Sequence, residues 1–211
     1  MYFIETISPE EATECVEVLY NHLQGAKEYL PNYARVFCHR PTLMAQIATL
    51  MDALRGHMDP RLWSLVNLAA ARAGNSSYCS LVFAHKLINR GMSQEQLLQV
   101  LQGDFATVIT EAEMQAMHYA AKVALDASTV CREDIEELLR CGFSDAEVFD
   151  ITAAAAWRCF FARVPDALGS QADQSLAQLD EKLLAQLLVG RPPQGDELTT
   201  SQGEPEPSLS C

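Results

Sequence analysis

Apolar residues return every three or four positions along most of the chain, the spacing of the buried face of a helix. No stretch shows the sustained alternation of apolar and polar residues that marks a half-buried strand. In the first periodic stretch, after Ser8, this spacing gathers the apolar side chains on one side of the helix. The pattern predicts an all-α protein with no sheet of consequence.

Capping residues and chain breakers locate the predicted helices. Most starts carry a capping serine, threonine or aspartate, a proline, or acidic residues in the first turn. Helix starts are predicted at Ser8, Pro41, Asp59, Ser76, Ser93, Thr110, Arg132, Asp145 and Ser175. Glycines end or separate several of these helices, at Gly56, Gly74, Gly91, Gly142 and Gly169. The last helix is expected to cover residues 175–188.

The helix after Asp59 is so apolar that it should be nearly surrounded by protein. No sequence period repeats, which favours one compact multi-helix bundle over a solenoid. We predict that this helical domain covers residues 1–190. Prolines, glycines, serines and acids dominate residues 191–211, so this acidic, proline-rich tail is predicted to be disordered.

Net charge, apolar runs and cysteine usage indicate which partners and which cell compartment to expect. The formal net charge of −13 argues against nucleic acid or an anionic membrane surface as partner. No apolar run is long enough to span a bilayer, and the first residues lack the pattern of a signal peptide. The seven cysteines include no CxxC pair, so we expect reduced thiols in a cytoplasmic protein. We predict no cofactor and no metal, since the adjacent Cys38 and His39 have no partner pair that would complete a zinc site.

The segment Asn75-Ser-Ser-Tyr-Cys79 offers the best candidate chemistry. If Ser76 is the N-cap, Cys79 lies in the first helical turn, where unpaired backbone N–H groups and the helix dipole favour a thiolate. The dipole contributes only ~0.3–1 kcal/mol, so other donors must help. The Ser76 hydroxyl is the nearest of these, and Tyr78 would shape the pocket. Cys79, Ser76 and Tyr78 are therefore candidate catalytic residues.

The other internal cysteines are expected at small, buried apolar positions, the usual place of a cysteine that forms no disulfide. They are Cys15, Cys38, Cys131, Cys141 and Cys159. Cys159 has an alternative role, because it lies on the long helix after Asp145 and could resolve an oxidised Cys79.

Several sequence blocks in a fixed order carry a family resemblance. They run from Leu30-Pro-Asn-Tyr-Ala-Arg-Val, through the segment that ends at Cys79, to Gly142-Phe-Ser-Asp-Ala-Glu-Val and Phe160-Phe-Ala-Arg-Val-Pro-Asp. Over about residues 29–170 the chain resembles the peroxidase-related branch of the alkylhydroperoxidase D and carboxymuconolactone decarboxylase superfamily. The resemblance implies the helical fold of that superfamily and a homo-oligomer, commonly a trimer or hexamer.

The resemblance also implies an active site, from which this chain departs. Peroxidase members carry Cys-x-x-Cys-x-x-x-His, in which the second cysteine attacks peroxide and the first resolves it as a disulfide. Aligned on Tyr78 and Cys79, the attacking position is Cys79, the resolving position is Ser76 and the histidine position is Phe83. The acid that the family places on the preceding helix is missing, since residues 62–64 lie there.

His85 is a further catalytic candidate. On a regular helix it lies about 120° around and about 9 Å along the axis from Cys79, so it cannot reach that sulfur within one chain. It could serve a neighbouring subunit. The alternative is an ordinary surface or core histidine.

Two main functions and a weaker third remain open. The first is a thiol-dependent, alkylhydroperoxidase-like antioxidant enzyme, in which Cys79 attacks a hydroperoxide and an external thiol reductant or a distant cysteine restores the thiol. Its activity should be weak, because the family's proton relay is missing. The alternative is a non-redox oligomeric scaffold or small-molecule-binding protein with a decayed CxxC site. A decarboxylase-like activity is a third, for which no proton-transfer group is identified near Cys79.

Overall fold

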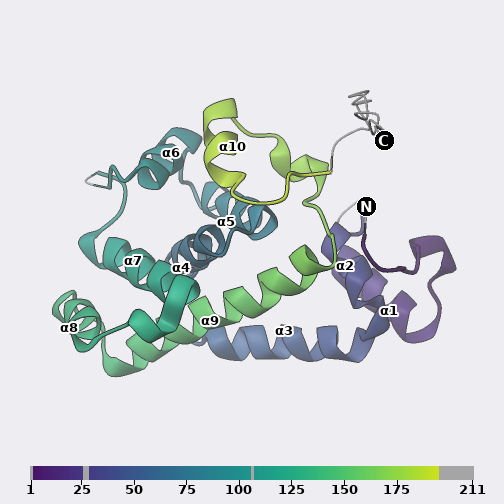
Figure 1. The fold of residues 1–211 in the computed structure, drawn as a ribbon, viewed down its shortest axis with the longest axis horizontal. Helices are drawn as coiled ribbons and strands as arrows, with labels where there is room; N and C mark the ends of the chain where they lie inside the picture. Colours follow the sequence, from purple (N-terminus) through teal and green to yellow (C-terminus); the bar gives the residue numbers. More distant parts are fainter. Residues whose placement is uncertain (1, 26–28, 106, 195–211) are drawn as a thin grey trace, which may run out of the picture.

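The computed structural model describes residues 2–25, 29–105 and 107–194, and within these ranges it contains helices and no strand (Figure 1). This confirms the predicted all-α class. The α-helices are α1 (Glu14–Gln24), α2 (Asn32–Val36), α3 (Pro41–Arg55), α4 (Pro60–Ala73), α5 (Ser77–Ile88), α6 (Gln94–Gln102), α7 (Glu111–Asp126), α8 (Arg132–Arg140), α9 (Asp145–Ala167) and α10 (Glu181–Leu187). The 3-10 turns are η1 (Pro9–Glu11), η2 (Phe37–His39), η3 (Ala127–Thr129) and η4 (Gln174–Ala177).

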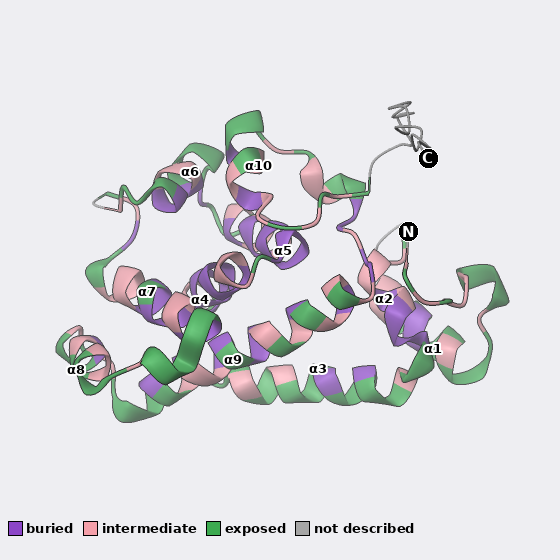
Figure 2. Cartoon of the chain, viewed as in Figure 1, coloured by how far each residue is buried: buried purple, intermediate pink, exposed green. Residues whose placement is uncertain are grey.

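Helix α4 is the centre of the main core. It packs against α5, α7 and α9, and every residue from Trp63 to Ala71 is buried (Figure 2). The Asp59 side chain caps its start by accepting hydrogen bonds from the backbone N–H groups of Arg61 and Leu62. The expectation that this helix is nearly surrounded by protein is thus confirmed.

A second, smaller core joins α1, α2 and α3 to the middle of α9, where Trp157 belongs to it. Figure 1 shows α3 lying alongside α9. Between the two cores, Cys79 of α5 packs with Ala71 of α4 and Ala162 of α9. The two alanines let three helices approach closely around the sulfur, which is how the fold places α9 side chains against the start of α5.

Helix α9 is the longest, with 23 residues, and carries the buried Arg158 in its middle. No helix in the described part of the chain is both long enough and apolar enough to cross a bilayer.

The first predicted helix starts later than expected. Ser8 opens only η1, the backbone is extended again at Ala12, and α1 begins at Glu14. The reason is tertiary: the Tyr20 hydroxyl of α1 donates to the Ile7 carbonyl at 2.8 Å, which lays the preceding segment back along α1.

The last predicted helix is divided in two. Residues 174–177 form η4, and α10 starts at Glu181. The Asp180 side chain accepts hydrogen bonds from the backbone N–H groups of Lys182 and Leu183, so it caps a new helix instead of lying inside a continuous one.

A C-terminal strap, residues 188–194, follows α10 and crosses the start of α5. The Gly190 N–H donates to the Ser77 hydroxyl at 2.8 Å, and the Arg191 guanidinium donates to the Asp166 carbonyl at 3.1 Å. The Gln194 N–H donates to the Ala172 carbonyl at 2.9 Å. Of the predicted disordered tail, residues 191–194 therefore contact the domain, and residues 195–211 lie outside the described residues.

The close approach at Gly190 gives a first prediction. A Cβ atom added there would lie 1.9 Å from the Asn75 carbonyl oxygen, and that oxygen belongs to the backbone that leads into α5. Gly190→Ala should therefore destabilise the fold by ~1–3 kcal/mol through overpacking. For a chain of this size, that corresponds to a fall in melting temperature of roughly 2–10 °C in a thermal scan.

Truncation after Gln194 is the control, because it keeps the strap and removes only residues of disordered composition. Its melting temperature should match that of the full chain. A Gly190→Ala variant that melts with the wild type would mean that the strap does not press on α5.

Candidate active site

The start of α5 holds Cys79, the candidate nucleophile. Ser76 is the N-cap, and its hydroxyl accepts a hydrogen bond from the Cys79 backbone N–H at 3.4 Å. This confirms the predicted cap. Asn75 has a positive φ of 57°, a conformation that asparagine tolerates better than most residues, and it turns the chain sharply from α4 into α5. Cys79 is buried, with 7% of its surface exposed.

The cation beside this thiol comes from α9. The Arg158 guanidinium donates from Nη1 to Cys79 Sγ at 3.6 Å, and Arg158 itself is only 3% exposed. Its Nε donates to the Asn67 side-chain carbonyl at 2.8 Å, and the Asn67 amide in turn donates to the Trp63 carbonyl at 2.8 Å. These bonds fix the orientation of the guanidinium, which points one of its N–H groups at the sulfur.

Aromatic rings complete the surroundings of this guanidinium. Its central carbon lies 4.4 Å from the centre of the Phe83 ring and 5.5 Å from that of Phe161. Arg158 takes part in none of the ion pairs between described side chains, which involve Arg61, Lys122 and Arg140. A buried cation is costly without compensating contacts, and here the Cys79 sulfur, the Asn67 side chain and two aromatic rings lie against it.

A small cavity of about 120 Å³ opens onto the sulfur. Aromatic and aliphatic side chains form most of its wall, and the polar groups in the wall are few. Those that bear on the chemistry are Ser76, Cys79, Arg158 and Asp166, with Tyr33 and Tyr78 beside them.

Asp166, from the last turn of α9, is the acid of the cavity. Burial raises the pKa of its carboxyl above the usual value, while a hydrogen bond from Ser76 and the positive charge of Arg191 act in the opposite direction. The carboxyl is therefore a better proton donor near neutral pH than an exposed aspartate.

Tyr78 contributes its ring to the cavity wall, but its hydroxyl is engaged elsewhere. That hydroxyl donates to the Asp173 carboxylate at 2.5 Å and accepts from the Tyr33 backbone N–H at 3.3 Å. Burial, followed by the charge of Asp173, raises the pKa of the Tyr78 phenol. Burial also raises the pKa of Tyr33 to about 12, so both phenols stay protonated at neutral pH.

His85 lies apart from this cavity. Its ring Nε2 is hydrogen-bonded to the Leu176 carbonyl at 2.9 Å, which ties α5 to η4. The structure thus brings together Ser76, the Tyr78 ring and Cys79, and it leaves His85 in a structural contact within the chain.

The burial of the other described cysteines agrees only in part with the sequence prediction. Cys38 is buried, as expected, but Cys15 and Cys131 are exposed, because α1 and the turn before α8 present these positions to solvent. Cys159 points its thiol toward the Ala124 carbonyl at 3.9 Å, on another face of α9 from Arg158. The six cysteines in the described ranges form no disulfide.

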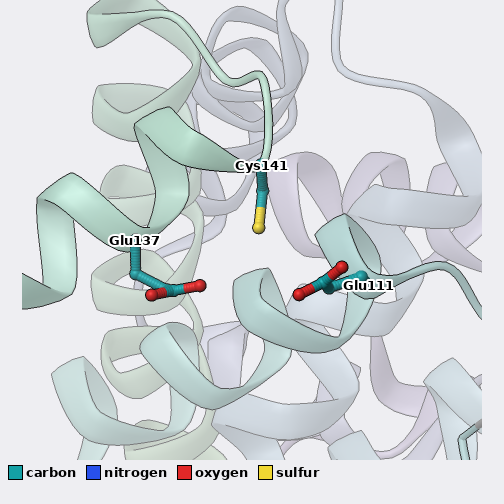
Figure 3. A group of neighbouring side chains, drawn as sticks. All are labelled: Glu111, Glu137 and Cys141. Carbon is teal, nitrogen blue, oxygen red and sulfur yellow. The ribbon is translucent and has the colours of Figure 1, made fainter.

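A second cluster of acidic and thiol groups lies between α7 and α8 (Figure 3). The side chains of Glu111, Glu137 and Cys141 have ligand atoms within 4.8 Å of one another. Glu137 also forms an ion pair with Arg140. Burial and the two carboxylates raise the pKa of the Cys141 thiol, which keeps it in the neutral form that binds metals poorly.

Comparison with known proteins identifies a matching family model and several solved structures with a similar fold. Residues 41–122 match the family model of the carboxymuconolactone decarboxylase family. Among solved structures, the alkylhydroperoxidase D core of an uncharacterized peroxidase-related protein from Ralstonia eutropha is 19% identical, with a TM-score of 0.72; the alignment covers 84% of this chain and 95% of that one. A peroxidase-related protein from Silicibacter sp. is 11% identical with a TM-score of 0.66, over 84% of this chain and 92% of that one.

The debrominase Bmp8, solved in complex with 2,3,4-tribromopyrrole, is also similar. It is 17% identical with a TM-score of 0.70, and the alignment covers 89% of this chain and 98% of that one. A comparison with curated proteins found no match. The protein therefore has the alkylhydroperoxidase D core fold, and residues 41–122 carry the sequence pattern of the carboxymuconolactone decarboxylase family. The expected fold is confirmed.

Sequence reasoning missed Arg158, Asn67 and Asp166. The available signal was a single arginine inside the apolar stretch Ala153–Phe161. An arginine at such a position is buried only when other groups contact its charge. The family match ends at residue 122, so neither Arg158 nor Asp166 falls within the matched segment.

The Arg158 contact generates the second prediction. Removing the cation with Arg158→Met should slow alkylation of Cys79 by iodoacetamide at pH 7 by roughly 10–100-fold, because a hydrogen bond to a charged group is worth ~1.5–3 kcal/mol. The rate would be followed by mass spectrometry of the Cys79 peptide. Arg163→Met, on an exposed position of the same helix, is the matched control and should leave the rate unchanged. A folded Arg158→Met protein that alkylates at the wild-type rate would remove Arg158 from the site.

Proposed function

We propose that the protein is a thiol-dependent peroxidase with one active-site cysteine, Cys79, acting on small hydroperoxides. The observation that carries the proposal is the contact between the buried Arg158 guanidinium and the Cys79 sulfur at the wall of a cavity. A thiolate is the nucleophile in such chemistry, and a desolvated cation stabilises it more strongly than the helix dipole alone.

The reaction would proceed in three balanced steps. The Cys79 thiolate attacks the terminal oxygen of ROOH, the S–O bond forms as the O–O bond breaks, and a proton converts the departing alkoxide to ROH. An external thiol then attacks the sulfenic acid, releasing water and forming a mixed disulfide with Cys79. A second external thiol displaces Cys79 and is released in an oxidised disulfide.

Two features of the site narrow the reactants. The cavity of about 120 Å³ has the volume of roughly four water molecules, which suits hydrogen peroxide or a short alkyl hydroperoxide. Ser76 occupies the position of a resolving cysteine and Cys159 points away, so the reductant is a separate thiol. Without a resolving cysteine in the site, turnover should be slow even where the first oxidation is fast.

The homo-oligomer implied by the resemblance remains part of the proposal. Several large apolar side chains are exposed on the single chain, and they would supply the contact area. They include Val18, Leu50, Leu125, Phe149 and Phe160.

A second candidate function is removal of a halogen from a small aromatic ring. The aromatic walls around Cys79, formed by Tyr33, Phe83 and Phe161, favour it, and the similarity to the debrominase Bmp8 makes it a specific alternative. Here the thiolate would take the halogen as a sulfenyl halide while the ring carbon gains a proton. Two external thiols would then restore Cys79 and release the halide and a disulfide.

The third prediction tests the oxidation step. Under limiting hydrogen peroxide, with a sulfenic-acid trap and mass spectrometry, Cys79 should be labelled before Cys15 and Cys131. Those two thiols are more exposed than Cys79 but lack the Arg158 contact, so the order of labelling separates activation from access. Cys79→Ser should abolish thiol-dependent peroxide consumption, and His85→Ala should leave it intact.

Removal of a halogen can be distinguished from peroxide reduction by its product, the halide ion. Bromide release from 2,3,4-tribromopyrrole in the presence of a thiol, lost in Cys79→Ser, would favour the second function if peroxide labelling is slow. Labelling that follows exposure alone, with no halide released, would contradict both functions and favour the non-redox scaffold.

A further inference from the structure

Both proposed reactions leave a strongly basic atom behind: an alkoxide oxygen in one case and a ring carbon in the other. This basic atom must be protonated as the bond to it breaks, and Arg158 cannot supply the proton because a guanidinium stays protonated in proteins. Resting on the proposed function, we infer that Asp166 is the catalytic acid that protonates the leaving group, and that Ser76 holds its carboxyl in place. Asp166 lies outside the segment matched by the family model, which ends at residue 122, and closes the last block of the family resemblance.

The placement of Asp166 follows from the end of α9. Its side chain and Cys79 line the same cavity of about 120 Å³, although they are 87 positions apart in the chain. Within α9, Arg158 lies two turns before Asp166, and both side chains are in the cavity wall. One helix thus supplies both a positive charge and a carboxyl group to the cavity that Cys79 lines.

Ser76 connects the acid to the nucleophile. Its oxygen accepts the Cys79 backbone N–H at 3.4 Å. Ser76 and Asp166 line the same cavity, where Ser76 acts to lower the pKa of the Asp166 carboxyl. The position at which the resemblance expects a resolving cysteine is therefore occupied by a residue that holds the acid. Ser76 is a positioning residue in this arrangement, and it takes no part in the bonds that change.

The charges around Asp166 are compatible with an acid that gains and loses a proton. Arg191 of the strap lies beside it and Arg158 shares its helix. Cys79 and Tyr33 line the same cavity. Burial raises the pKa of the Asp166 carboxyl despite the opposing effects of Ser76 and Arg191. The Tyr33 phenol has a pKa of about 12 and is a much weaker acid.

The proton balance closes without another group. The Cys79 thiol proton passes to the Asp166 carboxylate as the thiolate forms beside Arg158. The thiolate attacks ROOH, the O–O bond breaks, and the alkoxide takes the proton from the Asp166 carboxyl. The products are the Cys79 sulfenic acid, ROH and the Asp166 carboxylate, which is ready for the next thiol proton.

The test uses three small electrophiles that differ in what leaves. Iodoacetamide releases iodide and peracetic acid releases acetate, and neither leaving group needs a proton. tert-Butyl hydroperoxide releases an alkoxide, which does need one. The second-order rate of modification of Cys79 would be measured with each reagent in the full-length protein, for wild type, Asp166→Asn, Asp166→Glu and the control Asp150→Asn on the same helix.

Asp166→Asn should lower the rate with tert-butyl hydroperoxide by ~10²-fold or more, the usual contribution of general acid catalysis, and change the other two rates by less than about threefold. Asp166→Glu should recover part of the hydroperoxide rate, and Asp150→Asn should behave as wild type. Ser76→Ala should lower the ratio of hydroperoxide rate to peracetic acid rate, and Ser76→Thr, which keeps the hydroxyl, should restore it.

Three outcomes would overturn the inference, and they can be told apart. Equal losses with all three reagents in Asp166→Asn would give Asp166 a structural role only. No loss with the hydroperoxide would give it no role in the reaction. If wild-type Cys79 reacts with iodoacetamide but not with either peroxide, the peroxidase proposal itself fails, and the catalytic role of Asp166 in peroxide reduction fails with it.

Discussion

The structure depends on one interaction, the burial of the Arg158 guanidinium against the Cys79 sulfur. Moving a charged side chain into a protein interior costs several kcal/mol, and here the offsetting contacts come from two neighbouring helices, α4 and α5. Asn67 of α4 accepts one hydrogen bond, Phe83 of α5 lies under the guanidinium, and Cys79 accepts another N–H. Because no single helix could compensate this cation, α4, α5 and α9 must keep their packing for the site to exist.

The surroundings of Cys79 differ from the active site that the family resemblance implies. Where that pattern places a histidine, this chain has Phe83, whose ring supports the guanidinium instead of exchanging protons. A histidine can both stabilise a thiolate and carry its proton, whereas an arginine can only do the first. In the proposed mechanism the two tasks are divided between residues of α9, with Arg158 for the charge and Asp166 for the proton.

Sequence patterns predicted the elements and the local part of the site. Ser76 and Cys79 are three residues apart, so their capping contact is local and could be predicted from spacing alone. Arg158 contacts Cys79, and Asp166 lines the same cavity, because α5 and α9 both pack on α4. A single sequence contains no direct signal of that packing. The errors at Ser8 and Ser175 have the same origin, since a long-range hydrogen bond to Ile7 and the capping side chain of Asp180 decided where those helices begin.

The magnitudes show why the motif around Cys79 would not act outside this fold. A helix N-terminus alone contributes ~0.3–1 kcal/mol toward a thiolate, while a hydrogen bond from a charged donor contributes ~1.5–3 kcal/mol. The larger contribution comes from a residue 79 positions away, and its geometry is fixed by an asparagine on a third helix. Transferring residues 75–79 to the start of another helix would therefore carry over the cap but leave behind the contact with Arg158. In the proposed function, the reactivity of Cys79 therefore depends on how α4 holds α5 and α9 side by side. Substitutions that alter this packing should affect that reactivity even where they leave the segment around Cys79 unchanged.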